Sequence, residues 1–304
     1  MAYQQTLRSP VTLAGIGLHS GKPARVRIFP AGAGHGVRFR RTDAAPSVEI
    51  PARAEFVRST AWATVLGRDG VEVSTVEHCL AALRGLDVDN ALVEVSGPEL
   101  PILDGSALPY VRAVCGAGRT TQPAPRSVLQ VVKPVRVARG EAYCLLLPAQ
   151  GFRVTYSIDF GERFPEAQHV CLEITPGTFA TELAPARTFG FLEDVQRLRE
   201  AGKAQGGALH NAVVLHGGRV LNPEGLRMPD EMARHKMLDA VGDLSLCGKA
   251  IRGHLVVHRG GHALHTALVE ALLARPDAWA ERCRPESLPA HGLAEDPQPL
   301  SAAL

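Results

Sequence analysis

The length, composition and charge of the chain indicate a globular protein of about two domains. Its 304 residues are 45% hydrophobic and 21% charged, which is too apolar for a disordered chain and sufficient for a core in each domain. Its 33 Lys and Arg nearly balance its 31 Asp and Glu, which excludes the overall basic field of a nucleic-acid-binding protein, so no nucleic-acid partner is expected.

The N-terminal segment and the cysteines predict a cytoplasmic protein. Residues 1–15 lack an apolar run of signal-peptide length, and no window approaches the roughly 18 apolar residues of a membrane span. We therefore expect neither export nor a transmembrane segment. The six cysteines are widely spaced without a C-x-x-C pair, which is typical of reduced, mostly buried thiols.

Alternating and amphipathic segments predict an α+β protein. We place one domain at residues 1–120 and another at 127–284, because the segment 120–127 contains prolines and no apolar period, and we expect the Pro- and Ala-rich tail 285–304 to be loosely ordered. The predicted strands are 24–29, 37–40, 61–66, 91–95, 129–137, 144–147 and 153–158. The predicted helices are 75–83, 109–115, 191–199, 231–247 and 267–273.

Residues 74–85, STVEHCLAALRG, contain the first candidate site residues. In one interpretation the segment begins with a capping box, in which Glu77 reaches back to a backbone N–H at the start of the helix. In the other, His78 binds a metal ion, and Glu77 lies beside the reacting water as its general base. The segment alone leaves both interpretations open.

Residues 234–248, RHKMLDAVGDLSLCG, predict a buried helix that carries a polar row. His235, Asp239 and Asp243 are four residues apart, so each is displaced from the one before by about 40° of rotation and ~6 Å of rise. Because a buried, unpaired carboxylate costs several kcal/mol, the row either faces water, forms a hydrogen-bonded strip or holds a metal ion. An imidazole and a carboxylate at this spacing can reach one zinc ion, and a third protein ligand would leave a position open for water.

Residues 258–266, HRGGHALHT, place three histidines next to paired glycines. This pattern is consistent with a glycine turn before the last helix, with histidines facing solvent. Alternatively, His262 lies in a cleft near the metal and donates a proton to a leaving group, with Asp243 holding its imidazole in the charged form.

These clusters, in this order, closely resemble the UDP-3-O-acyl-N-acetylglucosamine deacetylases, which are zinc hydrolases of lipid A biosynthesis. The resemblance covers about residues 6–280. Its motifs are GIGLHSG (15–21), FRRTD (39–43), STVEH (74–78), LDVDNALVEV with PILDGSA (86–107), ARTFGF (186–191), RVLNPEGLRMPDE (219–231), RHKMLDAVGDL (234–244) and GGHAL (260–264). The resemblance implies two similar two-layer domains, each a mostly antiparallel sheet packed on helices, with the active site between them.

The resemblance also implies the metal site and the acid–base residues. The implied zinc ligands are His78, His235 and Asp239, and Fe²⁺ is an alternative ion in the cell. Glu77 is implied as the general base. His262 is implied as the general acid or electrostatic stabiliser, with Asp243 supporting it.

Further positions match residues that contact the substrate. Thr188 and Lys236 match positions that bind the developing oxyanion and the polar substrate face, and Phe189 matches an aromatic residue near the sugar nucleotide. The residues that match the site entrance are Leu18 and His19. Arg259 is a candidate for the diphosphate. An insert at about 187–214 would form a hydrophobic passage for the acyl chain.

The implied reaction is zinc-dependent hydrolysis of the acetamide of UDP-3-O-acyl-N-acetylglucosamine to the free amine and acetate, an early committed step of lipid A biosynthesis, by a monomer. One alternative is a related zinc amidase acting on another acylated sugar nucleotide. Another is a non-catalytic acyl- or nucleotide-binding relative. Such a protein should have lost at least one of the implied metal ligands or acid–base residues, and all five are present: Glu77, His78, His235, Asp239 and His262. Three positions depart from the usual family residues: Cys79, His210 and His265.

Overall fold

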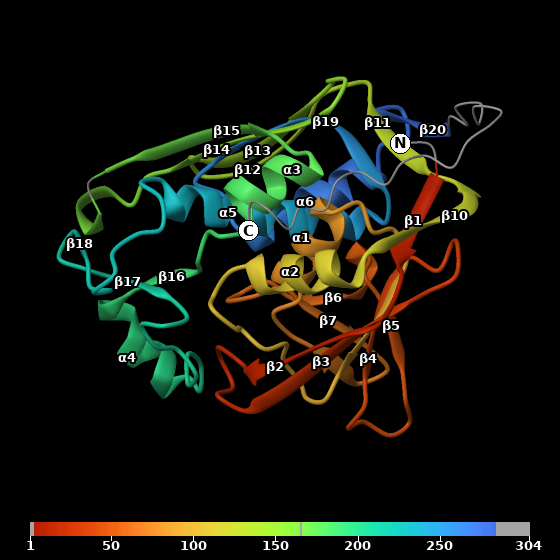
Figure 1. The fold of residues 1–304 in the computed structure, drawn as a ribbon. Coiled ribbons are helices and arrows are strands. Elements are labelled where there is room, and N and C mark those ends of the chain that lie inside the picture. The colour runs from red at the N-terminus through yellow and green to blue at the C-terminus, as the bar shows by residue number, and fades with distance from the viewer. Residues whose placement is uncertain (1–2, 165, 284–304) are drawn as a thin grey trace.

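The computed structural model describes residues 3–164 and 166–283, so the predicted tail at 285–304 lies outside the described residues. Two sheets face each other across a layer of helices (Figure 1). Both sheets are mostly antiparallel, which confirms the predicted α+β class. Within the described residues, no helix combines the length and the apolar character needed to cross a membrane.

The first sheet is formed by the N-terminal part of the chain. Its strands, in spatial order, are β2 (Val11–Ile16), β3 (Pro23–Pro30), β9 (Ala91–Val95), β4 (Val37–Arg41) and β5 (Glu49–Pro51). In β3 the side chains of Ala24, Val26 and Ile28 are buried while those of Arg25 and Arg27 are exposed, as expected for a strand with one face on the core. Helices α1 (Glu77–Gly85) and α2 (Leu108–Ala117) lie on the inner side of this sheet (Figure 1).

A smaller sheet beside it shows where one strand prediction is wrong. It consists of β6 (Val57–Ser59), β7 (Val65–Arg68) and β8 (Val71–Val73), and a short helix η1 (Ala54–Phe56) precedes it. The predicted strand 61–66 begins only at Val65. Residues 60–64 form a loop because the backbone N–H of Thr64 donates to the side chain of Glu77 instead of to a strand.

The second sheet is formed by the C-terminal part of the chain. Its main path is β12 (Val135–Arg139), β13 (Ala142–Leu147), β19 (Ala250–His258), β11 (Ser127–Val131) and β20 (Trp279–Cys283); β14 (Phe152–Ile158) pairs with β19, and β15 (Gln168–Glu173) pairs with β14. The predicted strand 129–137 is therefore two strands. They are separated at Pro134, which cannot donate a ladder hydrogen bond.

Helices from this half fill the layer between the sheets. The longest are α5 (Glu231–Leu244) and α6 (His262–Leu273), and the shorter ones are α3 (Pro176–Thr178), the π-helix η3 (Phe179–Leu183) and η4 (Ser245–Cys247). The exposed η2 (Gly161–Arg163) connects β14 to β15 outside this layer. α6 begins five residues before the predicted start at 267. The predicted helix 231–247 corresponds to α5 followed by η4.

The predicted linker at 120–127 is mostly a strand. β10 (Arg119–Pro125) pairs antiparallel with β1 (Tyr3–Leu7) in a two-stranded sheet. Proline is tolerated in such a strand because an edge position leaves some N–H groups unused. The domain boundary itself remains a prediction.

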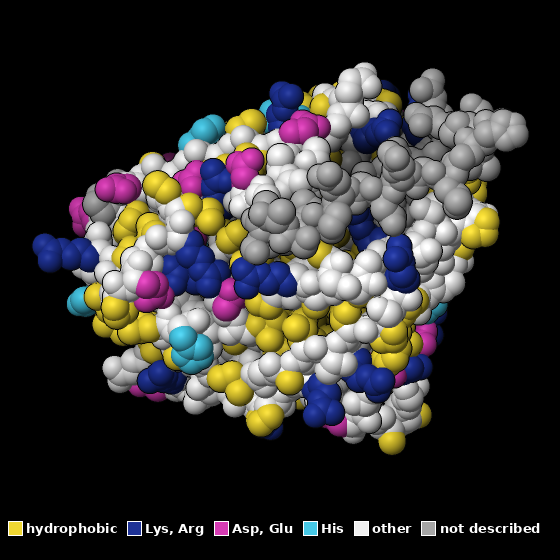
Figure 2. Space-filling view, in the orientation of Figure 1, with side chains coloured by type: hydrophobic (Ala, Val, Ile, Leu, Met, Phe, Trp, Pro, Cys, Tyr) yellow, Lys and Arg dark blue, Asp and Glu magenta, His cyan; other side chains and the backbone are white. Residues whose placement is uncertain are grey.

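Residues 189–220 contain a βαβ unit that projects from the main layers at the lower left of Figure 1. β16 (Phe189–Phe191) is followed by α4 (Leu192–Glu200) and then by the parallel strand β17 (Val213–His216), which pairs with β18 (Arg219–Val220). Figure 2 shows hydrophobic side chains on the surface near β17 and β18, mixed with Lys, Arg and His. Leu192 and Leu209 are exposed in this segment, and so is Leu221 directly after it.

Helices α1 and α5 cross in direct backbone contact. A Cβ added at Gly242 of α5 would collide with the carbonyl oxygen of Glu77 at the start of α1. Only glycine permits this approach. The crossing brings the 74–85 and 234–248 segments together.

Candidate active site

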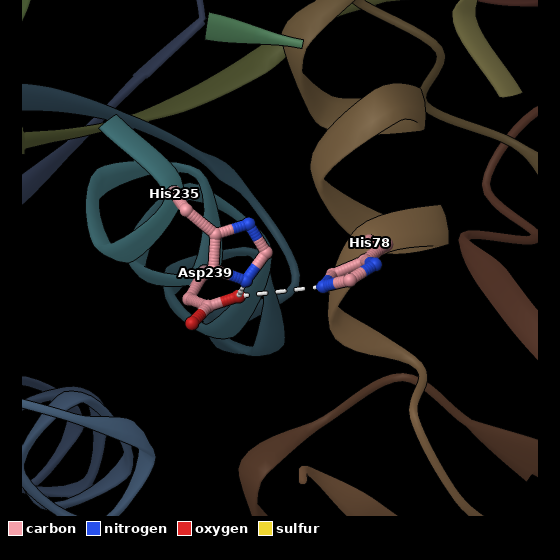
Figure 3. A group of neighbouring side chains, drawn as sticks. All are labelled: His78, His235 and Asp239. Carbon is pink, nitrogen blue, oxygen red and sulfur yellow. Dashed lines mark ion pairs between the residues drawn. The ribbon is translucent and has the colours of Figure 1, made fainter. Parts of the chain in front are cut away.

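His78, His235 and Asp239 form a compact buried group where α1 and α5 cross (Figure 3). His78 is the second residue of α1, and the other two lie one turn apart on α5. Asp239 Oδ1 is 3.6 Å from His78 Nε2 and 3.4 Å from His235 Nε2. The polar row therefore does not face solvent, and one donor atom from each of the three side chains lies within 4.8 Å of the others.

The protonation states of this group suit a metal ion. The Nδ1–H of His235 donates to the carbonyl oxygen of Ala186 (3.1 Å), which leaves the Nε2 lone pair directed into the group, and burial lowers the pKa of His235 to about 3. Burial would raise the pKa of Asp239, but Lys236 and His235 hold it well below its usual value. Asp239 Oδ1 is buried and receives no hydrogen bond from the residues that the structure describes. An imidazole and a carboxylate with an unsatisfied oxygen fit a divalent metal ion.

Lys236 and Phe189 lie at the edge of this group. Lys236 Nζ donates to Asp239 Oδ2 (2.7 Å) and lies 5.8 Å from the centre of the Phe189 ring. The Phe189 ring is edge-on to His235, with 6.2 Å between ring centres. Burial would lower the pKa of Lys236, but the Asp239 carboxylate raises it, so the amine stays charged.

Asp243, His262 and His265 form a second buried group next to the first. Asp243 Oδ2 accepts hydrogen bonds from Nδ1 of both His262 and His265, each at 2.8 Å. These ring nitrogens are already used, so we regard the group as a hydrogen-bonded cluster rather than a second metal site. Neither histidine faces solvent as the glycine-turn interpretation requires. Burial would lower the pKa of His262, but Asp243 and Asp239 raise it to about 9.

Glu77 lies between the two groups. Its Oε2 accepts from the backbone N–H of Thr64 (3.1 Å), and its Oε1 lies 4.0 Å from His262 Nε2. The residue directly before α1, at the N-cap position, is Val76, and its side chain makes no capping hydrogen bond. The capping-box interpretation is therefore wrong. Burial raises the pKa of Glu77, which brings a carboxylate closer to the range useful for a base near neutral pH.

The turn containing Leu18 and His19 is held by the buried carboxylate of Glu99. The backbone N–H groups of His19 and Ser20 donate to this carboxylate at 2.8 and 2.7 Å. A Cβ at Gly17 would collide with the same carboxylate, so a larger residue there would displace the Glu99 side chain. His19 Nδ1 is buried and has no hydrogen-bond partner within residues 3–164 and 166–283, and burial lowers the pKa of this histidine.

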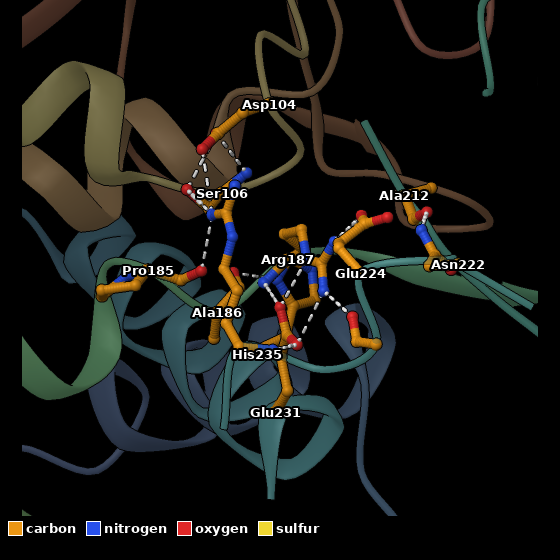
Figure 4. Close-up of polar contacts among 12 residues, drawn as sticks. Asp104, Ser106, Pro185, Ala186, Arg187, Ala212, Asn222, Glu224, Glu231 and His235 are labelled. Carbon is orange, nitrogen blue, oxygen red and sulfur yellow. Dashed lines mark hydrogen bonds and ion pairs between the residues drawn. The ribbon is translucent and has the colours of Figure 1, made fainter. Parts of the chain in front are cut away.

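A buried ion pair anchors the segment that contains Thr188 (Figure 4). Arg187 donates through Nε to Glu231 Oε1 (2.8 Å), through Nη2 to Glu231 Oε2 (3.1 Å) and through Nη1 to Glu224 (2.6 Å). The neighbouring backbone N–H of Thr188 donates to the carbonyl of Gly105 (2.7 Å). The pair therefore fixes residues 186–189 against the start of α5.

A family model described as UDP-3-O-acyl N-acetylglycosamine deacetylase matches residues 4–274. The chain belongs to this family. It is 47% identical over 276 residues to the UDP-3-O-acyl-N-acetylglucosamine deacetylase of Myxococcus xanthus strain DK1622, covering 91% of this chain and 88% of the relative. It is 48% identical over 288 residues to that of Phenylobacterium zucineum strain HLK1, covering 94% and 98%. With a Shewanella relative, strain W3-18-1, it shares 47% over 282 residues, 92% of each chain.

One predicted site residue, Arg259, and two of the departures from the usual family residues, Cys79 and His210, lie outside the two buried groups. Arg259 pairs with Glu141 (2.9 Å) and, within the described part of the chain, forms no hydrogen bond or ion pair with either group. Cys79 is buried in the core, and His210 is exposed. His265, the third departure from the usual residues, belongs to the Asp243 cluster.

Sequence reasoning missed several residues that support the site, notably Thr64, Tyr156 and the Arg187–Glu231 pair. Arg187 and Glu231 carried a signal, because both lie in matched motifs. Thr64 and Tyr156 carried none, since their partners are remote in sequence. A cavity of about 560 Å³ lies on another side of α1, lined by Leu80, Leu83 and Arg84 among others, and no predicted site residue lines it.

Proposed function

We propose that the chain deacetylates UDP-3-O-acyl-N-acetylglucosamine, releasing acetate and the free amine in lipid A biosynthesis. The observation that carries this proposal is the unsatisfied Asp239 Oδ1 between two imidazoles, with Glu77 and His262 beside it, in a chain of the deacetylase family. The whole arrangement is buried at the crossing of α1 and α5.

His78, His235 and Asp239 would hold a zinc ion, for which Fe²⁺ is an alternative in the cell. When bound, the ion supplies Lewis acidity to the amide carbonyl and makes water more acidic. The imidazole of His235 is already neutral, and Asp239 already carries its negative charge. The site would therefore take up a divalent ion without having to release protons from these two side chains.

Glu77 and His262 would carry out the proton transfers. Glu77, the base, would remove a proton from the attacking water. His262, held by Asp243 at Nδ1, presents Nε2 toward the same space and would protonate the leaving amine. Lys236 is charged and lies 5.8 Å from the Phe189 ring, so it suits the polar face of the substrate, and Thr188 would donate to the oxyanion.

The parts of the substrate would contact different segments. The βαβ insert, predicted at 187–214, would receive the acyl chain, because its exposed leucines offer apolar surface beside the site. Phe189 would pack near the sugar nucleotide, with Leu18 and His19 at the site entrance. Arg259 would reach the diphosphate only by giving up its pairing with Glu141.

We place the reaction in the cytoplasm and expect a monomer with domains at 1–120 and 127–284. All six cysteines lie within the described residues, and none of them is paired there in a disulfide. Three are buried, one is half-buried and two are exposed, so fewer are buried than the sequence predicted.

The decisive experiment combines elemental analysis with acetate release. Purified protein should contain about one equivalent of zinc or iron and should release acetate from UDP-3-O-acyl-N-acetylglucosamine, and a chelator should abolish this release. Acetate release should be compared across other acylated sugar nucleotides. A faster reaction with one of these would favour the related amidase, and no acetate from any of them would contradict the proposed function.

A further inference from the structure

We infer that Thr64 is a positioning residue that fixes the general base and the proton-donating imidazole relative to each other. The inference rests on the proposed function, since it concerns the geometry of Glu77 and His262. Thr64 is fully buried and lies in the loop just before β7. It is neither a metal ligand nor in a motif that the sequence singled out.

Thr64 contacts both acid–base partners through different atoms. Its backbone N–H donates to Glu77 Oε2 at 3.1 Å. Its hydroxyl lies 2.6 Å from Asp243 Oδ1 and 3.4 Å from His262 Nδ1. Its carbonyl accepts from the backbone N–H of Val76, just before α1, at 3.4 Å. One residue thus joins the loop, the start of α1 and the end of α5.

The direction of the hydroxyl hydrogen bond follows from its partners. Burial would raise the pKa of Asp243, but His262 and His265 lower it to about 2, so this carboxylate can only accept hydrogen bonds. The Nδ1–H of His262 already donates to Asp243 Oδ2. The single hydroxyl proton of Thr64 therefore points at Asp243 Oδ1.

This hydrogen bond completes the support of the Asp243 carboxylate. Its Oδ2 accepts hydrogen bonds from Nδ1 of His262 and of His265. The other ring nitrogen of His265, Nε2, lies 3.1 Å from the hydroxyl of Tyr156. Burial lowers the pKa of His265, so its ring is neutral and can accept from Tyr156. With donors on both oxygens, the carboxylate plane cannot rotate freely, and the His262 ring is fixed with it.

Fixing the ring determines where its other nitrogen points. His262 Nε2 lies 3.8 Å from Asp239 Oδ2 and 4.0 Å from Glu77 Oε1. Glu77 and Thr64 come from the N-terminal half, whereas Asp243 and His262 come from the C-terminal half. Without the Thr64 hydroxyl, Oδ1 would be buried without a donor, and the imidazole could tilt away from the base.

The test compares Thr64→Val with Thr64→Ser. Valine has nearly the shape of threonine and keeps the backbone contact to Glu77, but it removes the hydroxyl; serine keeps the hydroxyl. We expect Thr64→Val to lower kcat roughly 10–100-fold, as is typical when an outer hydrogen-bond partner is lost, with KM and metal content within about twofold of the unmodified protein. Thr64→Ser should recover most of kcat. Thr121→Val, at an exposed position of β10, is the matched control.

A double-mutant cycle separates positioning from general destabilisation. In an Asp243→Asn background, Thr64→Val should have little further effect on kcat, because both changes remove the same support. An equal loss in both backgrounds, or a Thr64→Val kcat within threefold of the unmodified protein, would overturn the inference. If Thr64→Val does not fold, Thr64→Ala replaces it in the same cycle. Failure of the proposed function is distinguishable, because the unmodified protein would then release no acetate.

Discussion

Replacing Arg187 with leucine should destabilise the protein substantially, because it leaves a buried carboxylate without its counter-charge. Arg187 is 2% exposed and Glu231 is 0% exposed. In the variant, Glu231 would keep only backbone donors, the N–H groups of residue 187 and Arg227. Breaking a buried ion pair from one side costs about 3–5 kcal/mol.

The predicted change is large enough to measure by thermal unfolding. At about 2–4 °C per kcal/mol for a chain of roughly this size, Tm should fall by about 6–20 °C. Arg197→Leu is the matched control, since Arg197 pairs with Asp194 on the surface with a side chain that is 78% exposed, and such pairs contribute about 0–1 kcal/mol. Equal Tm values for the two variants would refute the assignment of Arg187 as the anchor of residues 186–189.

Three further predictions concern the site itself. Glu77→Gln should lower kcat by roughly 10²–10⁴ while elemental analysis finds the metal retained; near-normal turnover would contradict its role as base. Asp239→Asn should weaken metal binding, and a fully loaded variant after dialysis would show that Asp239 is not a ligand. Because the pKa of His262, the proposed proton donor, is raised to about 9, kcat should decline as pH rises through that value. Asp243→Asn should shift the decline to lower pH, and an unchanged alkaline limb would exclude this coupling.

Local periodicity predicted the helices that carry the candidate metal ligands. The row of His235, Asp239 and Asp243 follows from helical geometry alone, and the alternation of β3 and β9 gave those strands within a residue of their observed ends. For His78 the segment 74–85 left two interpretations open, and the resemblance favoured the metal ligand. Helical spacing and strand alternation depend only on residues that are close together in the chain, so they can be predicted from the sequence.

Contacts between remote residues explain the failures. The strand predicted over 61–66 starts late because Thr64 bonds to Glu77 and to Asp243, 179 positions away. The capping box at Glu77 does not form because α1 begins at Glu77 itself, so this residue is the first of the helix rather than the third. The segment 120–127 looked like a linker because nothing near it in sequence reveals that β1 is its partner.

Gly242, at the crossing of α1 and α5, limits which amino-acid substitutions the protein can accept. Since the two main chains touch at Gly242, the spacing between Glu77 and the side chains of His235 and Asp239 is set by backbone rather than by the bulk of core residues. Substitutions in the surrounding core can accumulate while that spacing persists. A single added methyl group at position 242 would push the helices apart and impair catalysis without altering any reacting atom.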